Sequence, residues 1–227
     1  MKRSTRRMGA AGLLAVIIIT GCSTASRQSE PARVTPINVP EGSLTPAAQA
    51  KADSGRPPYT AADVRFMQGM ISHHGQAVVM AAWAPTHGAR PDVLVLAQRI
   101  GVAQRDEIEL MTHWLRDRRE TVPDTSAHHT HAGMDGHQSL SPGMLTADEL
   151  AQLGRATGPE FDRLFLTSMI RHHEGALAMV AQLLSSQGAA QDTDVYRFST
   201  DVNVDQITEI DRMRLMLRAS PPNSSLP

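Results

Sequence analysis

Two stretches of the chain carry the same potential metal-binding side chains in the same order. One stretch, FMQGMISHHGQAVVMA, begins at Phe66, and the other, FLTSMIRHHEGALAMV, begins at Phe165. Both place Phe, Met, Ile, His-His, Ala and Met at the same spacing, while most residues between them differ. Imidazole nitrogen and thioether sulfur together suit soft metal ions. The pattern therefore indicates either a soft-metal site or a duplicated hairpin that kept only its core.

The spacing puts these side chains on one face of a helix. At about 100° per residue, the methionines, histidines and alanine of each stretch fall within an arc of roughly 120°. A methionine stripe alone is more often plain core, because Met fills irregular gaps well. A buried imidazole without a partner costs about 1–3 kcal/mol, however. Packing alone gives no reason to keep all four histidines, so the His-His pairs favour a ligand.

The likeness of the two halves extends to a second helix in each. Gln104, Glu107, Ile108 and Met111 recur at the same spacing as Gln206, Glu209, Ile210 and Met213. Two copies of one helical hairpin predict an all-α, four-helix bundle in which each half covers the apolar face of the other. Candidate partners of the histidines are Glu107 and Glu209, Gln104 and Gln206, or a metal ion. The two carboxylates could make simple hydrogen bonds or orient metal-bound rings.

Capping and helix-breaking residues set the expected bounds. Long helices are expected at about 60–84, 91–119, 160–186 and 192–218, with Thr60 as an N-cap and Pro91 in a first turn. A capping box from Thr146 to Glu149 predicts a short helix that ends near Gly158. The helical domain is expected over 59–218, as repeat one 59–119, a His/Gly-rich loop 120–145 and repeat two 146–218.

The N-terminal residues 1–21 have the composition of an export signal. A basic start precedes the apolar stretch 9–19 and the tetrapeptide Ile19-Thr20-Gly21-Cys22, which resembles a bacterial lipobox. We expect a lipid on Cys22 and a position at the extracytoplasmic face of the membrane in the cell envelope; an ordinary secretory signal or an uncleaved anchor is the alternative. Residues 22–58 are expected to be a flexible tether, and 219–227 a disordered tail.

The available donors narrow the choice of metal. Cys22 is the only cysteine, so the mature domain has no thiolate, and soft-metal binding must rely on its Met and His residues. These donors favour Cu(I), and Ag(I) by the same softness, over Mg or Ca. With a formal net charge of −1, the chain has no excess of positive charge that would attract nucleic acid.

A second group of donors lies in the loop between the halves. It consists of His128, His129, His131, Met134 and His137. This run is too Gly-rich for a rigid site, but it is suited to loose capture of Cu(II) or Zn(II). The alternative is a low-complexity polar linker.

The pattern Met-Ile-x-His-His-x-x-Ala-x-x-Met, at 70–80 and 169–179, resembles the bacterial family called domain of unknown function 305 over about 59–218. The resemblance implies a ferritin-like helical bundle, secreted or lipid-anchored, with copper-binding relatives. The metal-facing positions that it implies are Met67, Met70, His73, His74 and Met80, then Met169, His172, His173 and Met179. The further candidates, as ligands or as supporting residues, are Glu107, Met111, Glu209 and Met213. Leu166 replaces the counterpart of Met67, so a weaker second site is expected.

The sequence thus predicts an extracytoplasmic copper-binding lipoprotein that buffers or transfers Cu(I), rather than an enzyme. A carboxylate-bridged di-iron bundle needs Glu-x-x-His pairs, and no Glu of this chain is followed by His three residues later. A copper-dependent redox enzyme and a metal-free helical scaffold are the alternatives.

Overall fold

The computed structural model describes residues 54–55, 58–124 and 140–219, which contain five helices and no strands. The helices are α2 (Ala61–Trp83), α3 (Pro91–Asp117), α4 (Ala147–Leu153), α5 (Gly158–Ser185) and α6 (Thr193–Ala219). The prediction of an all-α protein is confirmed. Cys22, the expected tether up to residue 53, the His-rich run 128–137 and residues 220–227 lie outside the described residues.

Local capping explains where several helices begin. The Thr60 side chain accepts from the backbone of Asp63, whose Oδ2 lies 2.6 Å from Thr60 N, which makes a capping box at α2. Thr146 and Glu149 make a second box at α4, as predicted. The short helix ends at Leu153 rather than near Gly158. Gly154 is the C-cap of α4, and α5 already begins at Gly158, with Pro159 in its first turn, where proline favours a helix start.

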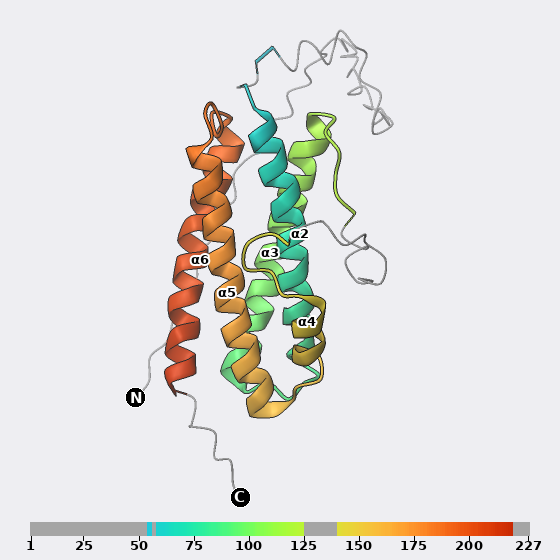
Figure 1. Ribbon diagram of the computed structural model, residues 1–227, viewed down its shortest axis with the longest axis vertical. Coiled ribbons are helices and arrows are strands. Elements are labelled where there is room, and N and C mark those ends of the chain that lie inside the picture. Colours follow the sequence, from blue (N-terminus) through green and yellow to red (C-terminus); the bar gives the residue numbers. More distant parts are fainter. Residues whose placement is uncertain (1–53, 56–57, 125–139, 220–227) are drawn as a thin grey trace, which may run out of the picture. The chain divides into compact units, whose positions relative to one another are not determined.

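Four long helices form two hairpins that pack on each other. α2 packs along α3, α5 packs along α6, and α2 lies against α5, with α4 resting on α5 (Figure 1). α2 and α5 run in opposite directions (Figure 1). The contact between α2 and α5 is therefore where side chains of the two repeated stretches meet. The ferritin-like classification stays a prediction.

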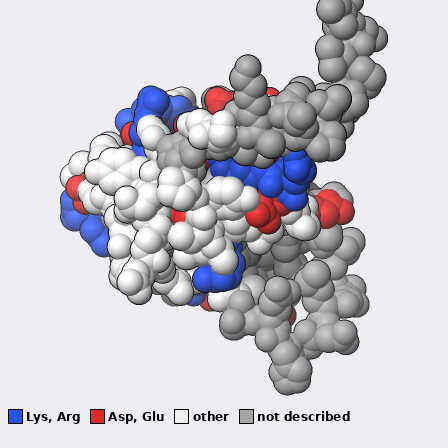
Figure 2. Space-filling view, turned by 90° about the horizontal axis from the view of Figure 1, so that it is seen from above, with Lys and Arg blue, Asp and Glu red and all other residues white. Residues whose placement is uncertain are grey.

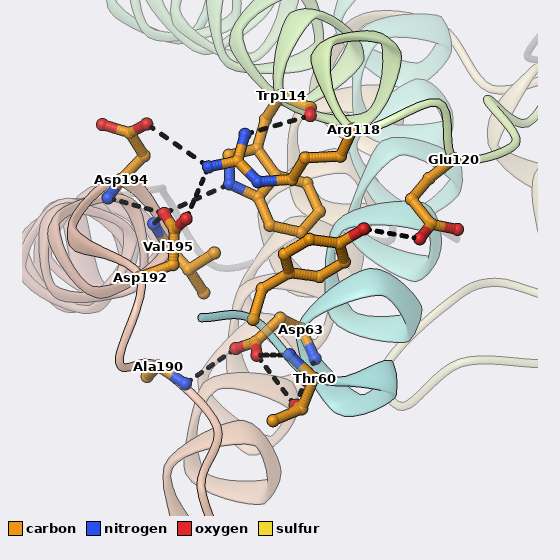
Figure 3. Close-up of polar contacts among 10 residues, drawn as sticks. Thr60, Asp63, Trp114, Arg118, Glu120, Ala190, Asp192, Asp194 and Val195 are labelled. Atoms are coloured by element: carbon orange, nitrogen blue, oxygen red, sulfur yellow. Dashed lines mark hydrogen bonds and ion pairs between the residues drawn. The ribbon is translucent and has the colours of Figure 1, made fainter. Parts of the chain in front are cut away.

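One end of the helical core is held by a network around Asp192 (Figure 3). The side chain of Asp192 accepts from Trp114 Nε1 at 3.2 Å and from the guanidinium of Arg118, both on or next to the end of α3. Close by, Asp63 Oδ1 accepts from Ala190 N at 2.7 Å. These contacts join the first hairpin to the loop before α6, so they fix how the two hairpins dock.

Among the described residues that Figure 2 colours, basic and acidic areas are interspersed with uncharged ones. Exposed ion pairs such as Arg171 with Glu149 and Arg214 with Glu174, each at 2.7 Å, fit this mixture. Within the described ranges, no helix is both long enough and apolar enough to span a membrane.

Candidate metal centre

Four histidines meet where α2 contacts α5, and none of them is exposed. His73, His74, His172 and His173 each have 0% of their surface accessible. The rings of His73 and His172 face each other with centroids 3.8 Å apart and planes tilted by 35°. Each lies 6.3 Å from the second ring of its own pair. The two pairs therefore form one connected row of imidazoles across the α2–α5 contact, which we call the histidine row.

A carboxylate stands at each outer end of the histidine row. His173 Nε2 lies 2.7 Å from Glu209 Oε2 of α6, in a hydrogen bond. His74 Nε2 lies 2.6 Å from Glu107 Oε2 of α3, close enough for an ion pair, although the angles do not make a hydrogen bond. The Glu side chains are 19% and 21% exposed, so the row runs from one partly exposed carboxylate to the other. The sequence-based pairing of these Glu residues with the His-His pairs is what the structure shows.

Many polar atoms in this region have no protein partner. The buried ring nitrogens without a hydrogen bond are Nδ1 of His73 and His173 and both nitrogens of His74 and His172. Gln104 and Gln206, each 2% exposed, also keep side-chain atoms without partners. Each such group costs about 1–3 kcal/mol when left unpaired. A bound cation at the ring nitrogens would remove part of that cost.

The central rings are held neutral. Burial first, then the ring of His74, lowers the pKa of His73 to about 3, although the Pro142 carbonyl opposes the shift. Burial likewise places the pKa of His172 well below its ordinary value, and the rings of His73 and His173 add to that effect. A neutral imidazole keeps a nitrogen lone pair, which is the form that binds a metal.

The carboxylates near the row also affect one another. Partial burial raises the pKa of Asp205, and Glu107, Glu209 and Asp201 raise it further. Carboxylates from α3 and α6 therefore lie near one another beside the outer ends of the row. The negative potential of these carboxylates favours the binding of a cation over that of an anion in this region.

The predicted methionines fall into two core clusters, one on each side of the histidine row along the helices. One cluster contains Met67, Met70, Met111 and Met179, and the other contains Met80, Met169, Met213 and Met216. Each cluster draws from both stretches, because α2 and α5 run in opposite directions. This differs from the expectation of one site per stretch.

Met216 was not among the residues predicted from the sequence. It belongs to the cluster with Met80, Met169 and Met213, and Met67 belongs to the other cluster. The weaker second site that Leu166 suggested stays a prediction. Among the described residues, no three His, Cys, Asp or Glu side chains gather round one point.

A further segment closes on the row. Residues 140–145, here called the strap, are held on α2 by Gln76, which donates to Leu145 O at 2.9 Å and accepts from Leu145 N at 2.7 Å. Pro142 O lies 3.0 Å from His73 Nε2. Sequence reasoning missed the strap, because no spacing rule connects it with α2. The only available signal was the difference between Gln76 and Gly175 at equivalent places in the two stretches.

Other histidines differ from those of the row. Both ring nitrogens of His87 have partners, with Nε2 3.0 Å from Gly154 O, which accepts, and Nδ1 3.0 Å from the hydroxyl Oγ1 of Thr86. His113 is exposed on α3. Neither lies in the histidine row.

Comparison with known proteins gives one family. The family model described as "Domain of unknown function (DUF305)" matches residues 63–217. A DUF305 fragment from Deinococcus radiodurans is 29% identical, with a TM-score of 0.60 over 71% of this chain and 99% of that one. A DUF305 protein from Streptomyces coelicolor, named as a secreted protein, is 26% identical, with a TM-score of 0.59 over 69% and 92%.

CopM is a third structural neighbour. In its Cu(II)-bound form it is 28% identical, with a TM-score of 0.54 over 69% of this chain and 95% of CopM. Its Cu(I)-bound and Ag-bound forms match as well. No curated protein sequence matches this chain. Since the family model spans most of the helical region, the chain belongs to the DUF305 family.

Proposed function

We propose that this protein binds Cu(I), and Ag(I) by the same chemistry, through the histidine row and the methionines beside it. The observation that carries the proposal is the row itself, in which buried imidazoles keep ring nitrogens without a hydrogen-bond partner and burial holds the central rings of His73 and His172 neutral. Histidines without a ligand normally satisfy those nitrogens, as the half-buried His87 does in this molecule.

The donor set favours a soft ion. Imidazole nitrogens lie between two clusters of buried methionines, and the only cysteine is Cys22, outside the described region. Thioether with imidazole and no thiolate suits Cu(I), whereas Zn(II) binds imidazole, thiolate and carboxylate rather than thioether. CopM, whose structures are named as Cu(I)-, Cu(II)- and Ag-bound, supports the same choice.

The copper ion is cargo in this proposal, and buffering, tolerance or transfer is the role. The proposed location is the extracytoplasmic face of the membrane, with a lipid on Cys22 as the anchor. The neighbour named as secreted supports export, and the lipobox-like residues 19–22 support the lipid. The His-rich run 128–137 is proposed as a looser collecting segment for copper or Zn(II).

The test is a competition titration of the full mature chain against a Cu(I) chelator. Because the rings of His73 and His172 are in contact, the two pairs should act together rather than as independent sites. We expect His73→Ala with His74→Ala, or His172→Ala with His173→Ala, to weaken Cu(I) binding, and the quadruple variant to abolish tight binding. Zn(II) affinity should change much less.

Binding should also stabilise the fold by about 2.7 kcal/mol at a hundredfold excess of Cu(I) over its dissociation constant. Thermal unfolding with and without Cu(I) measures that gain in the wild type and in each variant. A quadruple variant that holds Cu(I) as tightly as the wild type overturns the proposal and leaves a helical scaffold. Loss of binding only after the run 128–137 is replaced moves the site to the loop.

A further inference from the structure

The strap makes the two halves of the histidine row unequal. Pro142 O is within hydrogen-bond distance of His73 Nε2, at 3.0 Å, whereas neither ring nitrogen of His172 has a hydrogen-bond partner. The strap lies on the row from one side only, next to α4. It therefore distinguishes two rings that the repeated sequence alone would make equivalent.

The strap is seated on both helices of the α2–α5 contact. On α2, Gln76 makes two buried hydrogen bonds to the backbone of Leu145. On α5, a Cβ placed on Gly175 would lie 1.9 Å from Pro142 O, so no side chain fits there. Gly143 has φ 77°, and a Cβ on it would lie 2.4 Å from Arg171 O. The strap therefore packs closely against both α2 and α5.

The contacts of the strap with α2 and α5 explain why the repeated stretches differ at one position. Gln76 and Gly175 are each the second residue after a His-His pair. One helix supplies the anchor at that place, and the other supplies room for the Pro142 carbonyl. The divergence of these two positions within an otherwise shared pattern therefore follows from the strap.

The contact with Pro142 determines which nitrogen of His73 carries the proton. A carbonyl oxygen only accepts hydrogen bonds, so His73 Nε2 must be the donor of the neutral ring. Its lone pair is then on Nδ1, which is buried and has no partner. In metal sites, such a carbonyl contact fixes the orientation of the ring and raises its strength as a ligand.

We propose that the strap is the positioning element of the metal site: the Pro142 carbonyl, held in place by Gln76, presets His73 to offer Nδ1 before the ion arrives. This inference rests on the proposed Cu(I) binding. It makes His73 the preorganised ring and His172 the adaptable one. Pro142 also lines a cavity of about 220 Å³ shared with Gly69 and Met179, so a released strap has space to move into.

The first experiment uses no metal. In the full mature chain labelled with ¹⁵N at histidine, NMR should show His73 as the Nε2–H tautomer, with a slowly exchanging proton. Gln76→Ala and Gly175→Ala should each remove that preference. The matched control is Gln68→Ala, because Gln68 also ties α2 to a loop, donating to Thr121 O at 2.8 Å, but does not contact the strap. An unchanged His73 tautomer and proton exchange in both strap variants overturns the proposal.

The second experiment is the Cu(I) competition titration of the same variants. Supporting contacts to metal-bound His typically contribute at least ~10-fold in affinity, so Gln76→Ala should weaken Cu(I) binding by ~10-fold and Gln68→Ala should leave it unchanged. Gln76→Glu keeps the acceptor for Leu145 N and loses the donor to Leu145 O. It should fall between the wild type and Gln76→Ala. Circular dichroism confirms that each variant is folded.

The outcomes separate this inference from the proposed function. A wild-type chain without Cu(I) affinity overturns the metal site itself, and with it the role of the strap in binding. A wild type that binds, together with strap variants that lose the His73 tautomer but keep full affinity, overturns only the positioning role of the strap.

Discussion

The Asp192 network and the histidine row are both buried and both join the two hairpins, but they differ in how their polar atoms are satisfied. Asp192, with a side chain 1% exposed, accepts from Trp114, Arg118 and the backbone N–H groups of Asp194 and Val195 (Figure 3). The central rings of the row have nearly the opposite condition, because Nδ1 of His73 and both nitrogens of His172 have no hydrogen-bond partner. Polar burial with partners indicates a structural joint, and polar burial without them indicates a place for a ligand.

The electrostatics support the same contrast. Burial opposes ionisation of Asp192, but the hydrogen bonds from Arg118 and Trp114 outweigh it and lower the pKa of the carboxyl group. In the row, burial dominates and lowers the pKa of His73 and His172. One region therefore keeps an ionised group with its partners, and the other keeps neutral lone pairs.

The largest effect is expected from Asp192→Ala. It leaves the guanidinium of Arg118, 5% exposed, without its buried partner, so the free energy of unfolding should fall by about 3–5 kcal/mol. Cu(I) affinity of the folded protein should not change. Urea unfolding and chelator competition measure the two quantities. Asp194→Ala is the control, since Asp194 is 66% exposed and lies 3.9 Å from Arg118. A marked loss of Cu(I) affinity in Asp192→Ala would contradict the view that the Asp192 network is purely structural and that only the histidine row serves metal binding.

A smaller effect is expected from the carboxylates at the ends of the row. Glu209→Gln and Glu107→Gln should each reduce Cu(I) affinity by ~10-fold, because each removes the negative acceptor next to a ring Nε2. Stability without metal should change little, since both Glu side chains are partly exposed. Glu174→Gln, in an exposed pair with Arg214, is the matched control. Equal affinities in all three variants would show that the carboxylates do not support a bound metal.

The smallest effect is on the pH dependence of the metal-free protein. The folded pKa of His172 lies far below its ordinary value of 6.5, so the unfolded chain binds the extra proton and stability falls as the pH drops below 6.5. This ring should contribute a loss of about 1 kcal/mol between pH 6.5 and about pH 5.5. Carboxyl groups such as Asp192 act mainly below pH 4. Urea unfolding of the wild type and His172→Gln across this range isolates the row, and parallel curves would contradict a neutral buried ring.

The helices and the candidate face could be predicted because their signals are local. Thr60 with Asp63 caps α2, and Pro91 stands in the first turn of α3, so the helix starts could be predicted from neighbouring residues. The inward placement of the histidines follows from helical spacing alone. The contacts of Glu107 and Glu209 with these rings were also foreseeable, because both hairpins carry the same residues at the same spacing.

The arrangement across the hairpins could not be predicted in the same way. Met70 shares a core cluster with Met179 because α2 and α5 run in opposite directions, and no local pattern states that direction. The contact of Pro142 with His73 likewise joins parts of the chain that are far apart in sequence. Repeated residues revealed what the site is made of, but the pairing of its members depends on how the hairpins dock.

The most direct test of the histidine row is X-ray absorption at the copper edge on a Cu(I)-loaded chain whose loop donors are removed. The substitutions are His128→Ser, His129→Ser, His131→Ser, Met134→Ser and His137→Ser. We predict that this variant keeps its tightly bound copper and that the spectrum shows both sulfur and nitrogen neighbours, from the buried methionines and imidazoles. A variant that holds no copper, or one whose copper has no sulfur neighbour, would contradict the account.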